Sequence, residues 1–113
     1  MKLNELADKL KLDIRTAADH LEVDVTRGYS SDLMSDVMAN ATEGDLWITL
    51  QIHQNIVAVS VMKSLSGIIL VNSREPEEET LRKAEVEKVP IMISSLPAFE
   101  LAGRMYELGL RGT

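Results

Sequence analysis

The chain has 113 residues, of which 45% are hydrophobic and 27% charged, the composition of an ordinary globular protein. It contains no cysteine, which excludes a disulfide framework and a cysteine-based zinc site and fits a reducing compartment. The net charge of -6 argues against a general nucleic-acid or anionic-membrane surface, because phosphate contacts need clustered Lys and Arg.

The first residues contain no apolar segment of signal-peptide length, and no apolar run approaches the ~20 residues that cross a bilayer. We therefore expect a cytoplasmic protein without a membrane partner. At this length we expect one domain, spanning residues 1–113.

The N-terminal region shows a helical pattern followed by a strand pattern. Residues 3–10 repeat apolar side chains on one helical face, and residues 12–16 alternate apolar with polar side chains. These patterns predict a short helix and a half-buried strand, with a helical turn at 17–21.

Residues 5–21 can also be interpreted as a helix-turn-helix. Its recognition helix would offer only Arg15, Thr16 and His20 to a DNA groove. Five basic and six acidic residues lie among positions 1–30, so this segment lacks the excess of positive charge that a nucleic-acid partner requires.

From residue 23 onward, apolar runs alternate with helical periodicity. The predicted order is an extended segment at 23–29, a helix at 32–41, a strand at 46–50, a helix at 54–65, a strand at 67–71, a helix at 77–88, a strand at 91–93 and a helix at 96–108. The run Ile56–Met62 is β-branched enough for a strand, and we interpret it as a helix because Gly67 and another apolar run follow. Four strand-to-helix steps predict an α/β fold of three layers, with a mainly parallel sheet between helices.

Three expectations concern packing. The predicted helix at 77–88 buries only a thin apolar stripe, so we expect a second subunit to cover part of the sheet in a homodimer. Trp47 is expected in the core. The inward face predicted for the last helix consists of Phe99, Ala102, Met105 and Tyr106.

Polar side chains follow each predicted strand of the parallel sheet. Because the carboxyl ends of parallel strands share one edge, these residues are candidates for a site that binds a small anionic or nucleotide ligand. Arg74 is the only cation among them. The predicted ligand-binding residues are Ser30, Ser31, Gln51, His53, Gln54, Asn55, Asn72, Arg74 and Ser95. The alternative interpretation is that these residues serve only as helix caps and turns.

Catalysis is a second hypothesis, in which His53 acts with a Ser or Thr at the same edge. No orienting acid is indicated except Asp32 or Asp45, and a lone histidine without a second metal-binding residue nearby is a weak metal ligand. The sequence contains neither the phosphate-loop motif Gly-x-x-x-x-Gly-Lys-Ser/Thr nor the dinucleotide-binding motif Gly-x-Gly-x-x-Gly. We therefore predict no catalytic residue, no metal and no cofactor.

Several segments carry a resemblance to a known family. They are Val25–Val37, Gly44–Trp47, Thr49–Gln51, His53–Val59 and Gly67–Val71. Together they resemble the DRTGG domain over nearly the whole chain. The motif that names the family is imperfect here, since Asp24–Gly28 reads Asp-Val-Thr-Arg-Gly and Gly28 is its firm match.

This resemblance implies a fold similar to the N-terminal domain of HPr kinase/phosphorylase. Domains of this family also occur beside CBS domains in regulatory pyrophosphatases and in some phosphotransacetylases, where they are regulatory and form dimers. The resemblance therefore implies a non-catalytic regulatory or ligand-sensing domain that acts on a partner protein, without kinase activity.

Overall fold

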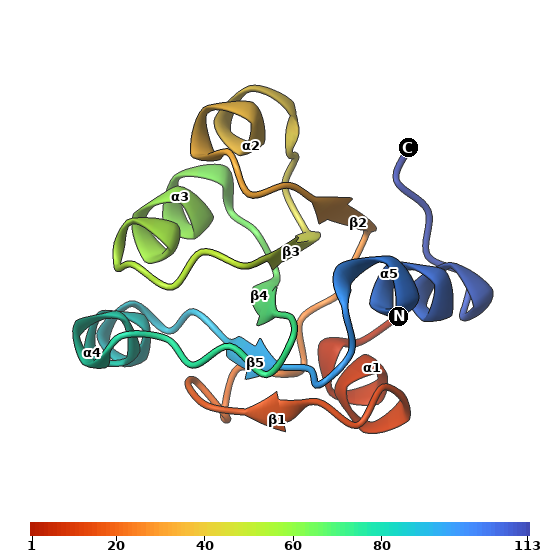
Figure 1. The fold of residues 1–113 in the computed structure, drawn as a ribbon, viewed down its shortest axis with the longest axis horizontal. Helices are drawn as coiled ribbons and strands as arrows, with labels where there is room; N and C mark the ends of the chain where they lie inside the picture. The colour runs from red at the N-terminus through yellow and green to blue at the C-terminus, as the bar shows by residue number, and fades with distance from the viewer.

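A five-stranded sheet runs through the middle of the molecule, with helices on both of its faces (Figure 1). The computed structural model describes residues 1–113. The elements follow along the chain as α1 (Leu3–Lys9), β1 (Asp13–Ile14), β2 (Arg27–Ser30), α2 (Met34–Asn40), β3 (Asp45–Thr49), α3 (Asn55–Lys63), β4 (Gly67–Leu70), α4 (Glu78–Glu87), β5 (Ile91–Ile93) and α5 (Ala98–Glu107). The segment Ile56–Met62 lies within α3, which confirms its interpretation as a helix.

The strands are arranged in the order β1-β5-β4-β3-β2. β2, β3, β4 and β5 are parallel to their neighbours, and the two-residue β1 pairs antiparallel with β5 at one end of the sheet. The α/β fold with a mainly parallel sheet is therefore confirmed.

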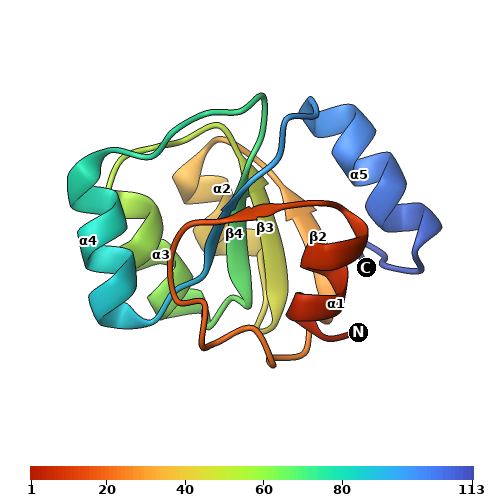
Figure 2. The ribbon, with the colours of Figure 1, turned by 90° about the horizontal axis from the view of Figure 1, so that it is seen from below.

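The helices divide into two layers. α2, α3 and α4 cover one face of the sheet, and α1 and α5 cover the other (Figures 1 and 2). Each face has its own hydrophobic cluster, and every residue of β3, β4 and β5 is buried. Trp47 is fully buried in the cluster beneath α2 and α3. No helix combines the length and the apolar character that crossing a membrane requires.

The covered sheet changes the argument for a homodimer. α4 buries only Thr80 and Ala84, so its contribution to the core is small. The strands beneath it are nevertheless shielded by the helices of the same chain. A second subunit is therefore not needed to cover the sheet. The homodimer stays a prediction, and it requires a different surface.

The helix-turn-helix interpretation of residues 5–21 is wrong. α1 is followed by β1, and the predicted helical turn at 17–21 is a series of turns without a second helix. Thr16, which would have faced DNA, is buried: its hydroxyl donates to the Val89 carbonyl oxygen at 2.7 Å and accepts from the Ile91 amide at 2.8 Å. The segment therefore anchors the N-terminal region to β5.

The predicted inward face of the last helix is half wrong. Met105 is buried and Ala102 is half-buried, but Phe99 is 91% exposed and Tyr106 is 58% exposed. Leu101 and Met105 instead fill the core beneath α5.

Candidate functional site

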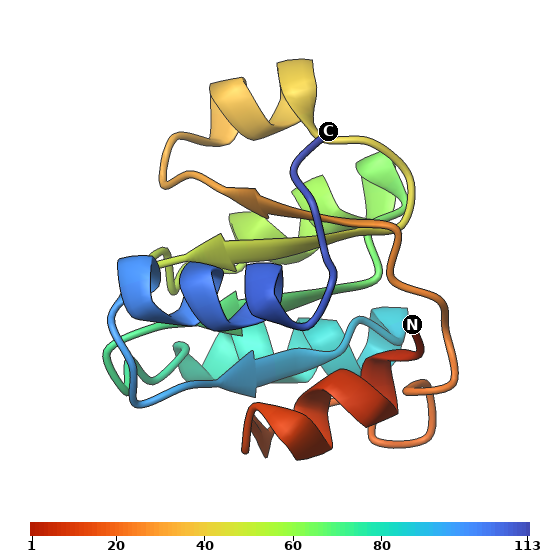
Figure 3. The same cartoon turned by 90° about the vertical axis from the view of Figure 1, so that its right-hand side faces the viewer.

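The loops that leave β2, β3, β4 and β5 lie along one edge of the sheet, the carboxyl edge, toward which the strand arrows point in Figure 3. The Oδ1 atom of Asp32, after β2, accepts hydrogen bonds from Thr49 Oγ1 at 2.9 Å and from the Leu50 amide at 2.7 Å. Gln51 Nε2 donates to the Asp32 carbonyl oxygen at 2.8 Å. The first two loops are therefore bonded together.

The loop after β4 is bonded in the same way to the loop after β5. The Asn72 amide donates to the Leu96 carbonyl oxygen at 2.9 Å, and the Ser73 amide donates to the Ser94 carbonyl oxygen at 2.8 Å. The Ser94 hydroxyl in turn accepts from the Leu96 amide at 3.1 Å. These bonds hold the second pair of loops against each other.

Arg74 joins the two pairs of loops. Its Nε donates to the Leu50 carbonyl oxygen at 3.3 Å, while its two terminal nitrogens form no hydrogen bond or ion pair within the chain. The neighbouring carboxylate of Glu75 is bound by Arg15 at 2.6 and 2.5 Å, and the hydrogen bond from Arg15 lowers the pKa of Glu75. Arg74 is therefore an exposed guanidinium at this edge that no carboxylate of the chain neutralises.

The structure brings the nine predicted ligand-binding residues to this one edge. Six of them are exposed, namely Ser30, His53, Asn55, Asn72, Arg74 and Ser95, and three are half-buried, namely Ser31, Gln51 and Gln54. Several side chains also stabilise their own loops: Ser31 Oγ accepts from the Leu33 amide at 3.2 Å, and His53 Nδ1 accepts from the Asn55 amide at 3.1 Å. Several of these residues therefore stabilise their own loops and also lie together at one edge of the sheet.

No hydrogen bond joins His53 to a hydroxyl or a carboxylate. Its Nδ1 is occupied by the Asn55 amide, and the Thr49 hydroxyl donates to Asp32 instead. A histidine that activates a nucleophile needs the nucleophile and an orienting acid within hydrogen-bond reach. No group of three or more His, Asp or Glu side chains is placed to hold a metal ion.

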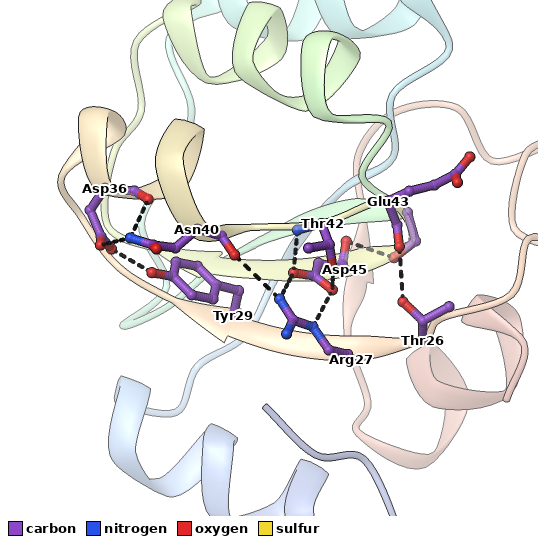
Figure 4. Close-up of polar contacts among 9 residues, drawn as sticks. Thr26, Arg27, Tyr29, Asp36, Asn40, Thr42, Glu43 and Asp45 are labelled. Carbon is purple, nitrogen blue, oxygen red and sulfur yellow. Dashed lines mark hydrogen bonds and ion pairs between the residues drawn. The ribbon is translucent and has the colours of Figure 1, made fainter. Parts of the chain in front are cut away.

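The sequence did not predict a polar network beneath α2, which Figure 4 shows in detail. Arg27 Nε and Nη2 donate to the two carboxylate oxygens of the fully buried Asp45 at 2.9 and 2.8 Å. Asp45 also accepts from the Thr42 amide at 2.8 Å. The signal that could have indicated this pair is a carboxylate at the start of an otherwise apolar strand, preceded along the chain by an arginine.

The network extends along α2 through a second carboxylate. Tyr29 donates its hydroxyl to Asp36 Oδ2 at 2.8 Å, and Asn40 Nδ2 donates to Asp36 Oδ1 at 2.9 Å (Figure 4). The hydrogen bond from Tyr29 is the largest cause that lowers the pKa of Asp36, and it raises the pKa of Tyr29. Because the carboxylates of Asp36 and Asp45 are both held by donors of this chain, we assign the network to stability.

A pocket of about 280 Å³ lies between α5 and β2, and we call it the α5–β2 pocket. It exists because the β2 positions that face α5 carry small residues, whereas the matching positions of β3 carry Leu46 and Ile48. Gly28 lies so close to α5 that an added Cβ would stand 3.3 Å from Met105 Cε. The lining residues are Gly28, Tyr29, Ser30, Ile48, Ala102, Met105, Tyr106, Leu110, Arg111 and Gly112.

The segment after α5 closes one end of this pocket. The Gly28 amide donates to the Arg111 carbonyl oxygen at 3.0 Å, and the Arg111 guanidinium stands 3.9 Å from the centre of the Tyr106 ring. Of the predicted ligand-binding residues, only Ser30 lines the pocket. Small residues at alternating positions of a strand are the sequence signal that could have indicated it.

No family model matches the sequence, and no curated protein matches it. Among solved structures, the fold is similar to the CBS and DRTGG domains of the regulatory region of a pyrophosphatase from Clostridium perfringens, complexed with the activator diadenosine tetraphosphate. The TM-score is 0.73 at 15% sequence identity, and the match covers 90% of this chain and 44% of that chain. This chain therefore spans less than half of that structure. At such low identity the likeness concerns the fold alone, and the fold of this chain is DRTGG-like.

Proposed function

We propose that this chain is a non-catalytic regulatory domain that senses a small anionic ligand, a nucleotide or a phosphorylated metabolite, at the carboxyl edge of the sheet. The ligand-binding residues are the nine that the sequence indicates at the strand ends. Arg74 supplies the positive charge, and exposed polar side chains such as Ser30, Asn72 and Ser95 supply hydrogen bonds.

The observation that carries this proposal is the free guanidinium of Arg74. It lies where the four loops meet, its Nε already fixes it to the backbone, and its terminal nitrogens have no partner. A guanidinium held in this way is suited to bind a phosphate or carboxylate with two parallel hydrogen bonds. The two nearby carboxylates are each bound by donors of this chain: Asp32 by the Thr49 hydroxyl and the Leu50 amide, and Glu75 by Arg15. They therefore repel an anion less than isolated carboxylates would.

The fold comparison supports a regulatory role. The similar structure belongs to the regulatory region of a pyrophosphatase and was solved with a nucleotide activator. A domain with no reaction of its own acts through what it contacts, so we propose a second copy of the chain or a partner protein as the recipient of the signal, in the cytoplasm.

Thermal unfolding in the presence of nucleotides and sugar phosphates tests the ligand. A ligand at a hundredfold excess over its dissociation constant stabilises the fold by about 2.7 kcal/mol. We expect Arg74→Ala to abolish this stabilisation. Arg82→Ala is the matched control, because Arg82 is another exposed arginine and pairs with Glu79 on α4, away from the strand ends.

His53→Ala separates ligand capture from catalysis. We expect this variant to keep most of the stabilisation, since Arg74 supplies the charge that captures the ligand and His53 Nδ1 is already bonded to the Asn55 amide. A panel in which no anionic ligand stabilises the wild-type chain would refute the sensor, and the polar residues would then serve only as caps and turns.

A further inference from the structure

The α5–β2 pocket plays no part in the proposed function, apart from the exposed Ser30 that it shares with the carboxyl edge. Its walls are largely apolar. Ile48, Met105 and Leu110 line it and are each at most 7% exposed, and Ala102 lines it from α5. An apolar wall gains free energy when an apolar group replaces the water against it. The pocket is therefore suited to the apolar part of a small molecule.

The volume of the pocket, about 280 Å³, limits the size of that molecule. Pockets that hold drug-sized ligands usually measure about 300–1,000 Å³, so this one is at the small end. Water occupies roughly 30 Å³ per molecule, which gives the pocket the space of about nine waters. It therefore fits a compound of roughly ten non-hydrogen atoms, such as a phenyl ring with a short side chain, and not a whole nucleotide.

The only charged residue that lines the pocket is Arg111, in the segment after α5. No Asp or Glu lines it, and Arg111 forms no ion pair with any carboxylate of the chain. The lining of the pocket is therefore positively charged, although the chain as a whole carries a net charge of -6. This local charge favours an anion.

Contacts within the chain hold the Arg111 side chain in place. Its Nη1 donates to the carbonyl oxygens of Tyr106 and Leu110, both at 2.9 Å, and its guanidinium lies 3.9 Å from the centre of the Tyr106 ring. The C-terminal segment itself passes beside β2, where the Gly28 amide donates to the Arg111 carbonyl oxygen at 3.0 Å (Figure 1). Because the guanidinium is already ordered, a ligand loses less free energy in binding to it.

Two nitrogens of the Arg111 guanidinium, Nε and Nη2, form no hydrogen bond within the chain. In Arg27, the same two nitrogens hold both oxygens of the Asp45 carboxylate at 2.9 and 2.8 Å. Arg111 therefore offers the pair of donors that binds a carboxylate through two parallel hydrogen bonds.

We propose that the α5–β2 pocket is a second ligand site, which binds a small monocarboxylic acid with an apolar body. The apolar body lies between β2 and α5 against Ile48 and Met105, and the carboxylate accepts hydrogen bonds from Nε and Nη2 of Arg111. One negative charge matches the one guanidinium. A phosphate dianion would bring a second charge against apolar walls without a partner, which costs free energy.

Phenylacetate tests this proposal, and phenylacetamide is its neutral analogue of the same shape. Amide NMR of the isotope-labelled chain follows both titrations: the amides of Gly28 and Gly112 report on the pocket, and that of Asn72 reports on the carboxyl edge. We expect phenylacetate to shift the two glycine amides saturably, with a dissociation constant on the order of 1 mM. Phenylacetamide should bind about tenfold more weakly, because it lacks the charge that strengthens the hydrogen bonds to Arg111.

Substitutions separate the charge of the pocket from its shape. Arg111→Gln should weaken phenylacetate about tenfold and leave phenylacetamide unchanged. Arg104→Gln is the matched control, because Arg104 is an exposed arginine of α5 that pairs with Glu100 and does not line the pocket. Ala102→Leu fills the pocket from a half-buried position and should abolish binding of both compounds, while thermal unfolding checks that the variant still folds.

Arg74→Ala keeps this test independent of the proposed function, since Arg74 does not line the pocket. We expect this variant to bind phenylacetate like the wild-type chain, whether or not the carboxyl edge binds a nucleotide or a sugar phosphate. Shifts that do not saturate by ~10 mM, phenylacetamide that binds as tightly as phenylacetate, or an Arg111→Gln variant that binds like wild type overturns the proposal. Loss of phenylacetate binding in Arg74→Ala also overturns it, because the acid would then occupy the carboxyl edge instead.

Discussion

Arg27 lies at the start of β2 and holds the carboxylate of Asp45, at the start of β3, through two hydrogen bonds of 2.9 and 2.8 Å. Asp45 is fully buried, whereas the Arg27 side chain is 23% exposed. The two residues are also paired in register across the parallel strands. This ion pair therefore links the edge strand β2 to its neighbour β3, and the Thr42 amide ties the α2–β3 loop to the same carboxylate.

Removing the buried carboxylate should be severely destabilising. In Asp45→Ala, the guanidinium of Arg27 and the Thr42 amide both lose their acceptor. We expect the free energy of unfolding to fall by about 3–4 kcal/mol, measured by urea denaturation. Asp24→Ala is the control: Asp24 is exposed and paired with Lys2 at 3.3 Å, so its loss should change stability by less than about 0.5 kcal/mol. Equal losses in the two variants would contradict the role of the buried pair.

Acid should weaken the fold through the same network. Burial by itself raises the pKa of Asp45, but the hydrogen bonds from Arg27 and Thr42 and the charge of Arg27 outweigh it and lower this pKa from the ordinary value near 3.8. The pKa of Asp36 is also lowered, chiefly by the Tyr29 hydroxyl. A carboxyl group whose pKa is lower when folded adds stability that is complete above its unfolded pKa and is lost as pH falls through its folded pKa.

We therefore expect the urea midpoint to decline once the pH falls below about 4. The decline should be smaller in Asp36→Asn and in Asp45→Asn, because each removes one of the titrating groups. An identical pH profile in all three proteins would show that these carboxylates do not control acid unfolding.

Alanine substitutions at Ser60 and Ser66 are expected to change the stability of the fold in opposite directions. Ser60 Oγ is buried in α3 without a hydrogen-bond partner, whereas Ser66 Oγ donates to the Asp45 carbonyl oxygen at 3.0 Å. Ser60→Ala should stabilise the fold by about 1 kcal/mol, since it removes an unpaired hydroxyl and introduces a better helix former. Ser66→Ala should destabilise it by about 1 kcal/mol. Thermal unfolding of both variants checks the signs, and a loss of stability in Ser60→Ala would be the contrary result.

Position 44 requires glycine because of its backbone conformation and because of the neighbouring Thr26 side chain. Its φ is +85°, and an added Cβ would stand 2.7 Å from Thr26 Oγ1. Gly109 has a φ of +107° with no atom near an added Cβ. We expect Gly109→Ala to cost about 1 kcal/mol from backbone strain alone, and Gly44→Ala to cost about 2–3 kcal/mol. If the collision is the reason for the difference, Thr26→Ala should recover part of the loss in Gly44→Ala.

The order of strands and helices after residue 23 was predictable from the sequence. Continuous apolar runs bounded by Gly and Pro indicated β3, β4 and β5, and helical periodicity indicated the helices between them. Local pattern suffices here because a strand buried on both faces is apolar over most of its length, as β3 is between Asp45 and Thr49. The same reasoning placed the polar residues after these strands, including Arg74, at one edge of the sheet.

The tertiary structure decided which side of α5 is buried. Two apolar stripes run along this helix: one contains Phe99, Ala102 and Tyr106, and the other contains Leu101 and Met105. Periodicity identifies both stripes and cannot choose between them. The choice depends on how α5 crosses β2 and β3, and this leaves Phe99 in solvent.

The tertiary structure also determined the conformation of residues 15–21 and produced the Arg27–Asp45 pair and the α5–β2 pocket. Local sequence suggested helical turns at 17–21, but Thr16 bonds to β5 across more than 70 residues of chain. The ion pair joins neighbouring strands 18 residues apart, and the pocket needs β2, α5 and the C-terminal segment together. Each of these features is a contact between segments distant in sequence. Such contacts follow from packing, whereas the apolar pattern within a segment specifies only its own secondary structure and its buried face.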